Sequence, residues 1–312
     1  MVFKAETYSG ELSEKLQSII KMIVAVVTGL EGLVGPKVSS LYAKALARHL
    51  YGELGLDGLD PGDALRLLNR SPWRLDVYEE NGSRLRGEDG GWAAYLIARE
   101  CPVRQALYQE DLPPGGLLCS AMGGVLSLVF SRAVEGARVE LTRYGPNACL
   151  LRLGMGERWE PPAAVSERPG VEEYAGLLWG FYTAFTKSMG RALEETLGNA
   201  PITGYRAARS YGFREGAALL AELGRSVGLE EAIDVINSRL GRFVRVGRED
   251  DLLLIEGSGI CAAVAECCPQ YRFLANGVVR GFLAGLLSAL TGERLNLAVA
   301  EEFVLLKVIK GG

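Results

Sequence analysis

The chain repeats itself, and this internal repeat constrains the fold more than any other feature of the sequence. Gly35–Gly55 reads GPKVSSLYAKALARHLYGELG and Gly204–Gly224 reads GYRAARSYGFREGAALLAELG, with glycine, tyrosine, leucine and glutamate at the same places. The similarity continues through later segments at nearly constant spacing. We therefore expect the two halves to superpose, with four pairs equivalent: Gly55 and Gly224, Asn69 and Asn237, Pro102 and Pro269, and Gly136 and Gly292.

A proline-containing stretch separates the two halves. Pro161, Pro162 and Pro169 interrupt any helix between the copies. The length of 312 residues is also roughly twice the common size of one domain. The sequence therefore predicts a first copy over 1–153, a linker over 154–170 and a second copy over 171–312.

Each copy combines helical and strand patterns. In the second copy, apolar residues three and four apart predict helices, and short runs rich in Val, Ile, Leu and Phe predict strands. The expected order is three helices, a hairpin, a strongly apolar helix that ends at Gly292, and a final hairpin. The predicted helices are 171–197, 205–223, 230–240 and 279–290, and the predicted strands are 242–246, 252–255, 295–299 and 303–309. This order indicates an α+β fold with an antiparallel sheet in each copy.

The composition excludes several classes of protein. Apolar residues make up 48% and charged residues 23%, which is typical of a folded globular chain. The net charge of −4 and the dispersed basic residues argue against a nucleic-acid partner. His49 is the only histidine, so a histidine-rich metal site is excluded. Arginine outnumbers lysine, which fits a thermophile or a GC-rich genome.

Neither long apolar segment of the sequence reads as a membrane span. Leu112–Ser131 has the length of a span but contains two prolines and two glycine pairs, and Met22–Leu30 is too short. The first ten residues include Lys4 and Glu6 and have no apolar core of a signal peptide. We therefore expect a cytoplasmic protein without a membrane span.

The strongly apolar helix of the second copy carries a recognisable motif. In GFLAGLLSALTGERL, Gly281 and Gly285 lie four residues apart and Gly292 follows before a strand. This motif resembles the 4-vinyl reductase domain family, whose members bind small molecules, hydrocarbons and aromatic compounds among them. The order of elements is similar to the NO-signalling/Golgi-transport ligand-binding fold, which haem nitric-oxide sensors and vesicle-tethering subunits share.

The resemblance implies a pocket between the glycine helix and the sheet. Glycines four apart leave room on one helix face, which either another backbone or a flat ligand could use. Because the second copy has the cleaner motif, we expect the ligand there. The predicted contacts are Gly281, Gly285, Phe282, Leu286, Phe243 and Tyr271 in the second copy, and Phe130, Trp73 and Trp92 in the first.

The first helix of the second copy is rich in aromatic residues, which cannot all face one core. Family members commonly dimerise through their early helices, so the resemblance implies an intramolecular pseudo-dimer of the two copies. A helix buried on several sides within one domain is the alternative. The residues concerned are Tyr174, Trp179, Phe181, Tyr182 and Phe185.

The first copy carries an insertion over Gln105–Leu118 that the second copy lacks. Its consecutive prolines and glycines predict a loop rather than a helix. We expect this loop beside the glycine helix of the first copy, where it would cap the pocket or shield Cys119.

Members of the 4-vinyl reductase domain family often bind zinc through cysteines and a glutamate, and this sequence departs from that pattern. The second copy has Asn276 and Val299 at two of the ligand positions. The first copy offers only Cys119, Cys149 and Glu140, fewer than the four ligands of a structural zinc site. We therefore expect neither zinc nor another cofactor.

The six cysteines are too sparse for a disulfide framework in a chain of this length. Cys101 and Cys268 are equivalent in the repeat, and each precedes a proline that we expect to begin a loop. The adjacent Cys267 and Cys268 should point apart, as neighbours do in an extended strand.

These observations favour a non-catalytic binding or sensing module for a small hydrophobic or aromatic molecule. No DNA-binding helix-turn-helix accompanies the copies, so a sensor would act through an unknown partner protein. One alternative is an accessory factor in tetrapyrrole vinyl reduction, although the sequence has no nicotinamide or flavin motif to supply a hydride. The other alternative is an adaptor or interaction scaffold whose pocket has closed.

Overall fold

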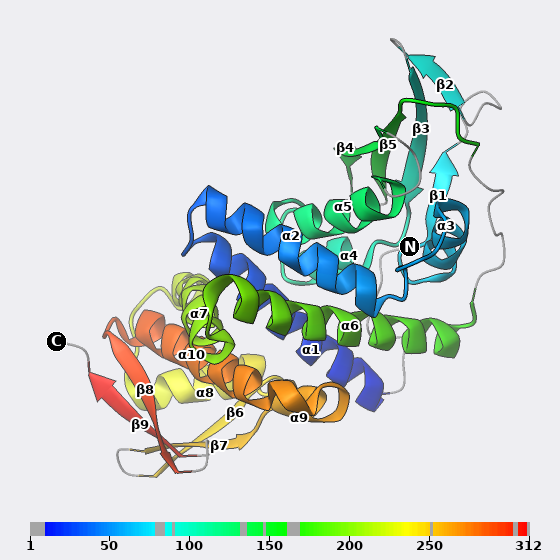
Figure 1. Cartoon of the computed structure of the whole chain (residues 1–312). Coiled ribbons are helices and arrows are strands. Elements are labelled where there is room, and N and C mark those ends of the chain that lie inside the picture. Colours follow the sequence, from blue (N-terminus) through cyan, green and yellow to red (C-terminus); the bar gives the residue numbers. More distant parts are fainter. Residues whose placement is uncertain are drawn as a thin grey trace. The chain divides into compact units, whose positions relative to one another are not determined.

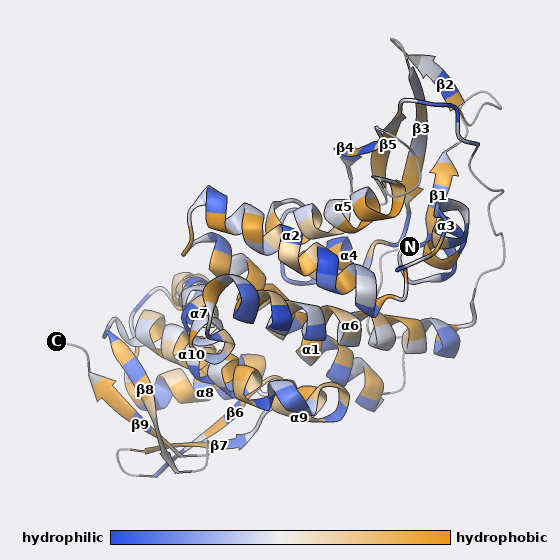
Figure 2. Cartoon of the chain, viewed as in Figure 1, coloured by the Kyte–Doolittle hydropathy of each residue, from blue (hydrophilic) through white to orange (hydrophobic). Residues whose placement is uncertain are grey.

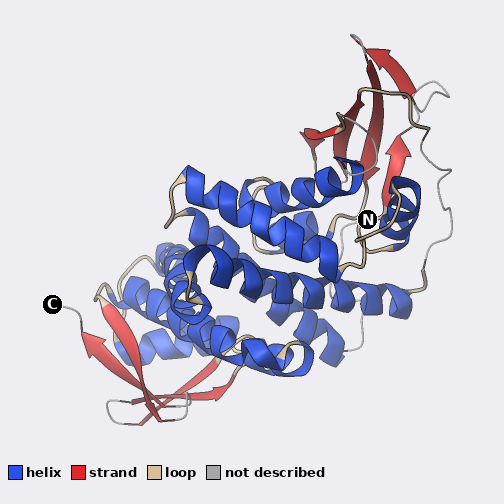
Figure 3. Cartoon of the chain, viewed as in Figure 1, coloured by secondary structure: helices blue, strands red, loops and turns tan. Residues whose placement is uncertain are grey.

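The computed structural model of the chain describes residues 10–78, 85–88, 91–131, 136–145, 148–160, 169–249, 252–301 and 305–310. Within these ranges the protein is a mixed α+β structure with antiparallel sheets, which confirms the predicted fold class at that level. Figure 3 shows the two separate sheets and the helices that make up most of the chain. Pro161 and Pro162 of the predicted linker lie outside the described residues.

Within the described residues, the two halves follow the same order of elements, apart from one short extra strand and one 3₁₀ turn (Figure 1). The first half contains α1 (Gly10–Glu31), α2 (Pro36–Glu53), α3 (Pro61–Arg70), β1 (Leu75–Tyr78), β2 (Leu85–Glu88), β3 (Gly91–Ala98), α4 (Pro102–Gln109), α5 (Gly116–Ser131), β4 (Arg138–Tyr144) and β5 (Cys149–Met155). The second half contains α6 (Val171–Leu197), α7 (Ala200–Leu223), α8 (Leu229–Leu240), β6 (Arg245–Glu249), β7 (Leu252–Gly257), α9 (Gly259–Cys267), the 3₁₀ turn Pro269–Tyr271, α10 (Arg272–Thr291), β8 (Leu295–Glu301) and β9 (Leu305–Lys310).

The two sheets share one strand order. The first runs β1-β3-β5-β4, with β2 also paired to β3, and the second runs β6-β7-β9-β8. In the second sheet, Leu297 of β8 lies opposite Val308 of β9. Since side chains alternate along a strand, Val308 faces one side of this sheet and its neighbour Ile309 faces the other.

Three of the four residue pairs expected to be equivalent have similar local geometry in the two halves. The fourth expectation was wrong, because Pro102 begins α4 directly after β3, whereas Pro269 comes after α9 and begins the 3₁₀ turn before α10. Gly55 and Gly224 have φ of 67° and 72°, and Gly136 and Gly292 have φ of 71° and 72°. This left-handed conformation is common where a helix has just ended, and it favours glycine. The Asn69 amide donates to the carbonyl of Leu75 at 3.0 Å, and the Asn237 amide donates to that of Val246 at 2.7 Å. Each asparagine thus ties the third helix of its half to the strand that follows.

The compact units of the structure do not follow the order of the chain. One unit contains Ser40–Ala192, and the other contains Gly10–Ser39 together with Leu193–Gly312. Helix α1 therefore belongs with the second half, and most of α6 belongs with the first. Arg191 of α6 pairs with Glu53 of α2 at 2.8 Å, and Lys15 of α1 pairs with Glu266 of α9 at 2.6 Å. The compact units therefore differ from the predicted division at 153 and 171 in where they place α1 and most of α6.

Two short helices, α4 and α9, were not predicted. Pro102 begins α4, since proline suits the first position of a helix, so the first part of the insertion Gln105–Leu118 is helical. Only Glu110–Gly115 of the predicted loop lies between α4 and α5. The Ser258 hydroxyl caps α9 by accepting from the Cys261 amide at 3.2 Å. Since α9 ends at Cys267, the expectation of an extended strand at Cys267 and Cys268 was wrong.

Helix α10 forms the core of the second unit. Figure 2 colours much of this helix as hydrophobic, and the residues Val278–Leu290, apart from Arg280, are buried. Pro269–Thr291 has the length and composition to span a membrane, with a hydropathy of 1.6, but 83% of its most apolar window is buried in the protein. A buried core helix has the same composition, so these properties do not assign it to a membrane.

Candidate functional site

The glycines of α10 are used for contact with α7. A Cβ atom added at Gly281 would overlap the carbonyl oxygen of Tyr205, and one at Gly285 would meet the Phe213 amide nitrogen at 2.5 Å. One turn earlier, a Cβ at Gly277 would lie 2.5 Å from the carbonyl oxygen of Pro201. Backbone atoms of α7 therefore fill the space that the missing side chains leave.

Glycines of α7 make the same close approach from the opposite side. A Cβ at Gly212 would overlap the carbonyl oxygen of Phe282, and one at Gly216 would lie 2.9 Å from that of Leu286. The two helices thus pack backbone against backbone along several turns. Of the two uses considered for Gly281 and Gly285, the structure has helix packing, and no room remains on this face for a flat ligand.

Phe282 and Phe243 lie together around the ammonium group of Lys21. The Lys21 Nζ atom is 5.1 Å from the ring centroid of Tyr211 and 5.6 Å from those of Phe243 and Phe282. Such distances are typical of cation–π contacts. Two of the aromatic residues predicted to hold a ligand, Phe243 and Phe282, therefore lie around a side chain of α1.

Lys21 is also bound by polar groups of α7. Its ammonium group donates to Glu215 Oε2 at 2.9 Å and to the Tyr211 hydroxyl at 3.3 Å, and its side chain is only 5% exposed. Lys21 was not among the predicted site residues, although a lysine beside an apolar stretch of a helix indicates a specific partner. Lys21 thus fixes α1 against α7 within the second unit.

The remaining predicted contact residues are buried or pack against other side chains. Leu286 is fully buried in α10, and Tyr271 is buried in the 3₁₀ turn before it. In the first unit, Trp73 is buried and Phe130 packs edge-on against Trp159 at 5.6 Å. Trp92 is half-buried, with the Arg158 guanidinium 5.1 Å from its ring centroid.

The candidate metal ligands have other partners. Cys119 is half-buried and its thiol accepts from the Gly115 amide at 3.1 Å, and Cys149 lies 3.7 Å from an Arg104 nitrogen. Glu140 pairs with Arg152 at 3.8 Å. Burial is the main reason that the pKa of the neighbouring Cys101 thiol is raised to about 12. Across the described ranges, no group of three or more His, Cys, Asp or Glu residues could hold a metal ion.

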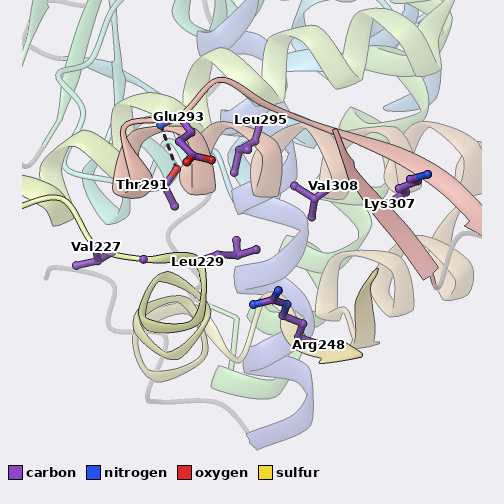
Figure 4. Close-up of a pocket in the computed structure, with 9 residues that line it drawn as sticks. Val227, Leu229, Arg248, Thr291, Glu293, Leu295, Lys307 and Val308 are labelled. Carbon is purple, nitrogen blue, oxygen red and sulfur yellow. Dashed lines mark hydrogen bonds between the residues drawn. The ribbon is translucent and has the colours of Figure 1, made fainter. Parts of the chain in front are cut away.

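The second unit contains a half-open hollow with a volume of about 490 Å³. It lies where the end of α10 and the start of α8 meet strands β6, β8 and β9. We call it the hollow, and its lining comprises Val227, Gly228, Leu229, Arg248, Thr291, Glu293, Leu295, Lys307 and Val308. Figure 4 shows Leu229, Leu295 and Val308 pointing toward one another from one helix and two strands. None of the predicted contact residues lines this hollow.

The hollow is lined by both apolar and polar side chains. Its lining combines aliphatic side chains with the charged residues Arg248, Glu293 and Lys307. Arg248 pairs with Glu230 of α8, and Lys307 points away from the three aliphatic side chains (Figure 4). The Thr291 hydroxyl donates to the Leu287 carbonyl at 2.7 Å and accepts from the Glu293 amide at 3.2 Å. The lining therefore lacks a nucleophile paired with a base, while its volume falls within the usual range for small-molecule sites.

The chain matches no protein-family model, no curated protein and no solved structure. The resemblance to the 4-vinyl reductase domain family therefore rests on the glycine motif and the order of elements alone.

Proposed function

We propose that the protein is a non-catalytic binding module for a small hydrophobic or aromatic molecule, with its site in the hollow of the second unit. The observation that carries the proposal is the convergence of Leu229, Leu295 and Val308 on one space of about 490 Å³. Burying a six-carbon body there would contribute about 0.8 kcal/mol per CH₂ group, about 5 kcal/mol in total, which corresponds to sub-millimolar binding before ordering costs, so a ligand with micromolar affinity must bury a larger apolar body. The ligand would lie at the end of the glycine helix rather than against its glycines.

The fold of the 4-vinyl reductase domain, the tandem duplication and the pseudo-dimer belong to the same proposal. Equal strand order in the two sheets and the grouping of α1 with the second half and of most of α6 with the first support them. An adaptor with a closed pocket is the second candidate, because α7 and Lys21 fill the space that the family resemblance assigned to a ligand. Binding in the hollow distinguishes the two functions.

Replacing Val308 by tryptophan should fill the hollow and weaken ligand binding at least tenfold. The measurement is native mass spectrometry and a thermal-shift screen of the purified chain against alkylphenols and fatty acids, followed by titration of any compound that binds. Ile309→Trp is the matched control, because Ile309 is the next residue of β9, is 45% exposed and faces the other side of the sheet. Equal weakening by both variants, or no binding by any compound, would contradict a site in the hollow.

A further inference from the structure

Two adjacent thiols meet at the end of α9, outside the hollow. Cys267 is the last residue of α9, and Cys268 follows it with φ of −150° and ψ of 58°. Their Sγ atoms lie 2.7 Å apart, against about 2.05 Å between the sulfur atoms of a disulfide. The side chains therefore point toward each other, and a bond between them needs only a small movement.

The two thiols differ in their access to solvent. Cys268 is fully buried, and Cys267 is half-buried. The Cys268 amide donates to the Val264 carbonyl at 2.8 Å, and its own carbonyl accepts from the Tyr271 amide at 2.8 Å, which holds this thiol in place. A reagent from solution can therefore reach Cys267 first, while Cys268 can react only with its neighbour.

We propose that Cys267 and Cys268 form a reversible dithiol–disulfide site that reacts with low-molecular-weight disulfides. The Cys267 thiolate attacks one sulfur of the reagent, forms a mixed disulfide and releases one thiolate, which takes up the proton that Cys267 lost. The Cys268 thiolate then attacks the Cys267 sulfur and releases the second thiolate, which takes up the proton of Cys268. The cysteines lose two electrons, and the reagent disulfide is reduced to two thiols.

The covalent geometry makes this bond easy to reopen. Adjacent Cα atoms are about 3.80 Å apart, whereas most disulfides join Cα atoms about 4.4–6.8 Å apart, so the closed ring is strained and more reducible. Glu266, the residue before Cys267, pairs with Lys15 of α1. Closing and opening the bond thus act on the end of α9 that contacts α1.

The test is intact mass spectrometry of the reduced full-length chain after exposure to oxidised glutathione. We expect a loss of about 2 Da, because two thiol hydrogens leave, with a Cys267–Cys268 link in the peptide map and recovery on adding dithiothreitol. Cys267→Ser and Cys268→Ser should each abolish the loss. Cys261→Ser is the control in the same helix and should retain it, since the Cys261 thiol contacts Asn276 at 3.2 Å and burial raises its pKa.

Three results would overturn the proposal. They are a stable glutathione adduct on the wild-type chain without the loss of two hydrogens, an unreacted wild-type chain, and a persistent loss of two hydrogens in Cys267→Ser. Cys101 provides an internal reference, because the residue before it is Glu100 rather than a second cysteine. Cys101 should therefore remain a free thiol throughout.

Discussion

Replacing Gly281 or Gly285 by alanine should lower the free energy of unfolding by about 3 kcal/mol or more, the upper end of the cost of overpacking. The added methyl group would overlap the carbonyl oxygen of Tyr205 in one variant and that of Arg209 in the other. Backbone atoms cannot rotate away as a flexible side chain can, so α7 and α10 would have to separate. Urea denaturation followed by circular dichroism measures the change.

Gly176 and Gly180 provide the matched control, because they have the same four-residue spacing in helix α6. An added Cβ meets no atom within 4 Å at either position. Alanine there should raise the free energy of unfolding by about 0.4–1 kcal/mol, since it restricts the unfolded chain and favours the helix. If Gly281→Ala were stabilising in the same way, α7 and α10 would not be in contact, and the space could belong to a ligand after all.

Replacing Lys21 by alanine should cost about 2–4 kcal/mol, somewhat less than the loss of one partner from a fully buried ion pair. The variant leaves Glu215 without its cation and opens a cavity among the rings of Tyr211, Phe243 and Phe282. The Glu215 side chain is 28% exposed, so water relieves part of the penalty. Hydrogen–deuterium exchange of the backbone amides of α1 should become faster, because Lys21 holds this helix against α7.

Two further variants separate the charge from the packing. Lys21→Met retains most of the side-chain volume and should cost less than Lys21→Ala, since an apolar residue can replace a buried charge when its packing is kept. Lys15→Met removes a more exposed lysine of the same helix, 25% exposed at its side chain, and should have a much smaller effect. Equal losses from Lys15→Met and Lys21→Ala would show that the aromatic rings do not bind the Lys21 ammonium group.

Local signals of the sequence predicted much of the fold. The end of α10 at Gly292 and the hairpins of the second half follow from glycine, proline and apolar spacing, all of which act over a few residues. Helix α9 was missed because it is short and its capping residue, Ser258, lies between two glycines that suggest a turn. The strand predicted over 303–309 is described from Leu305, and residues 303 and 304 lie outside the described ranges.

The candidate site was harder to predict because it depends on contacts between distant segments. The pairs Gly176–Gly180 and Gly281–Gly285 have the same spacing in the sequence, yet only the second pair touches another backbone. Lys15 and Lys21 also lie on one helix, and only Lys21 is enclosed by aromatic rings. The grouping of α1 with the second half is likewise a long-range feature that no local pattern encodes.

A crystal structure of the full chain soaked with the tightest-binding alkylphenol or fatty acid tests the proposed ligand site most directly. We predict electron density for the compound beside Leu229, Leu295 and Val308 of the second unit. The same soak of the Val308→Trp variant should leave the hollow without the compound. Density between α7 and α10, or in the first unit beside Cys119, would contradict the assignment of the binding site to the hollow.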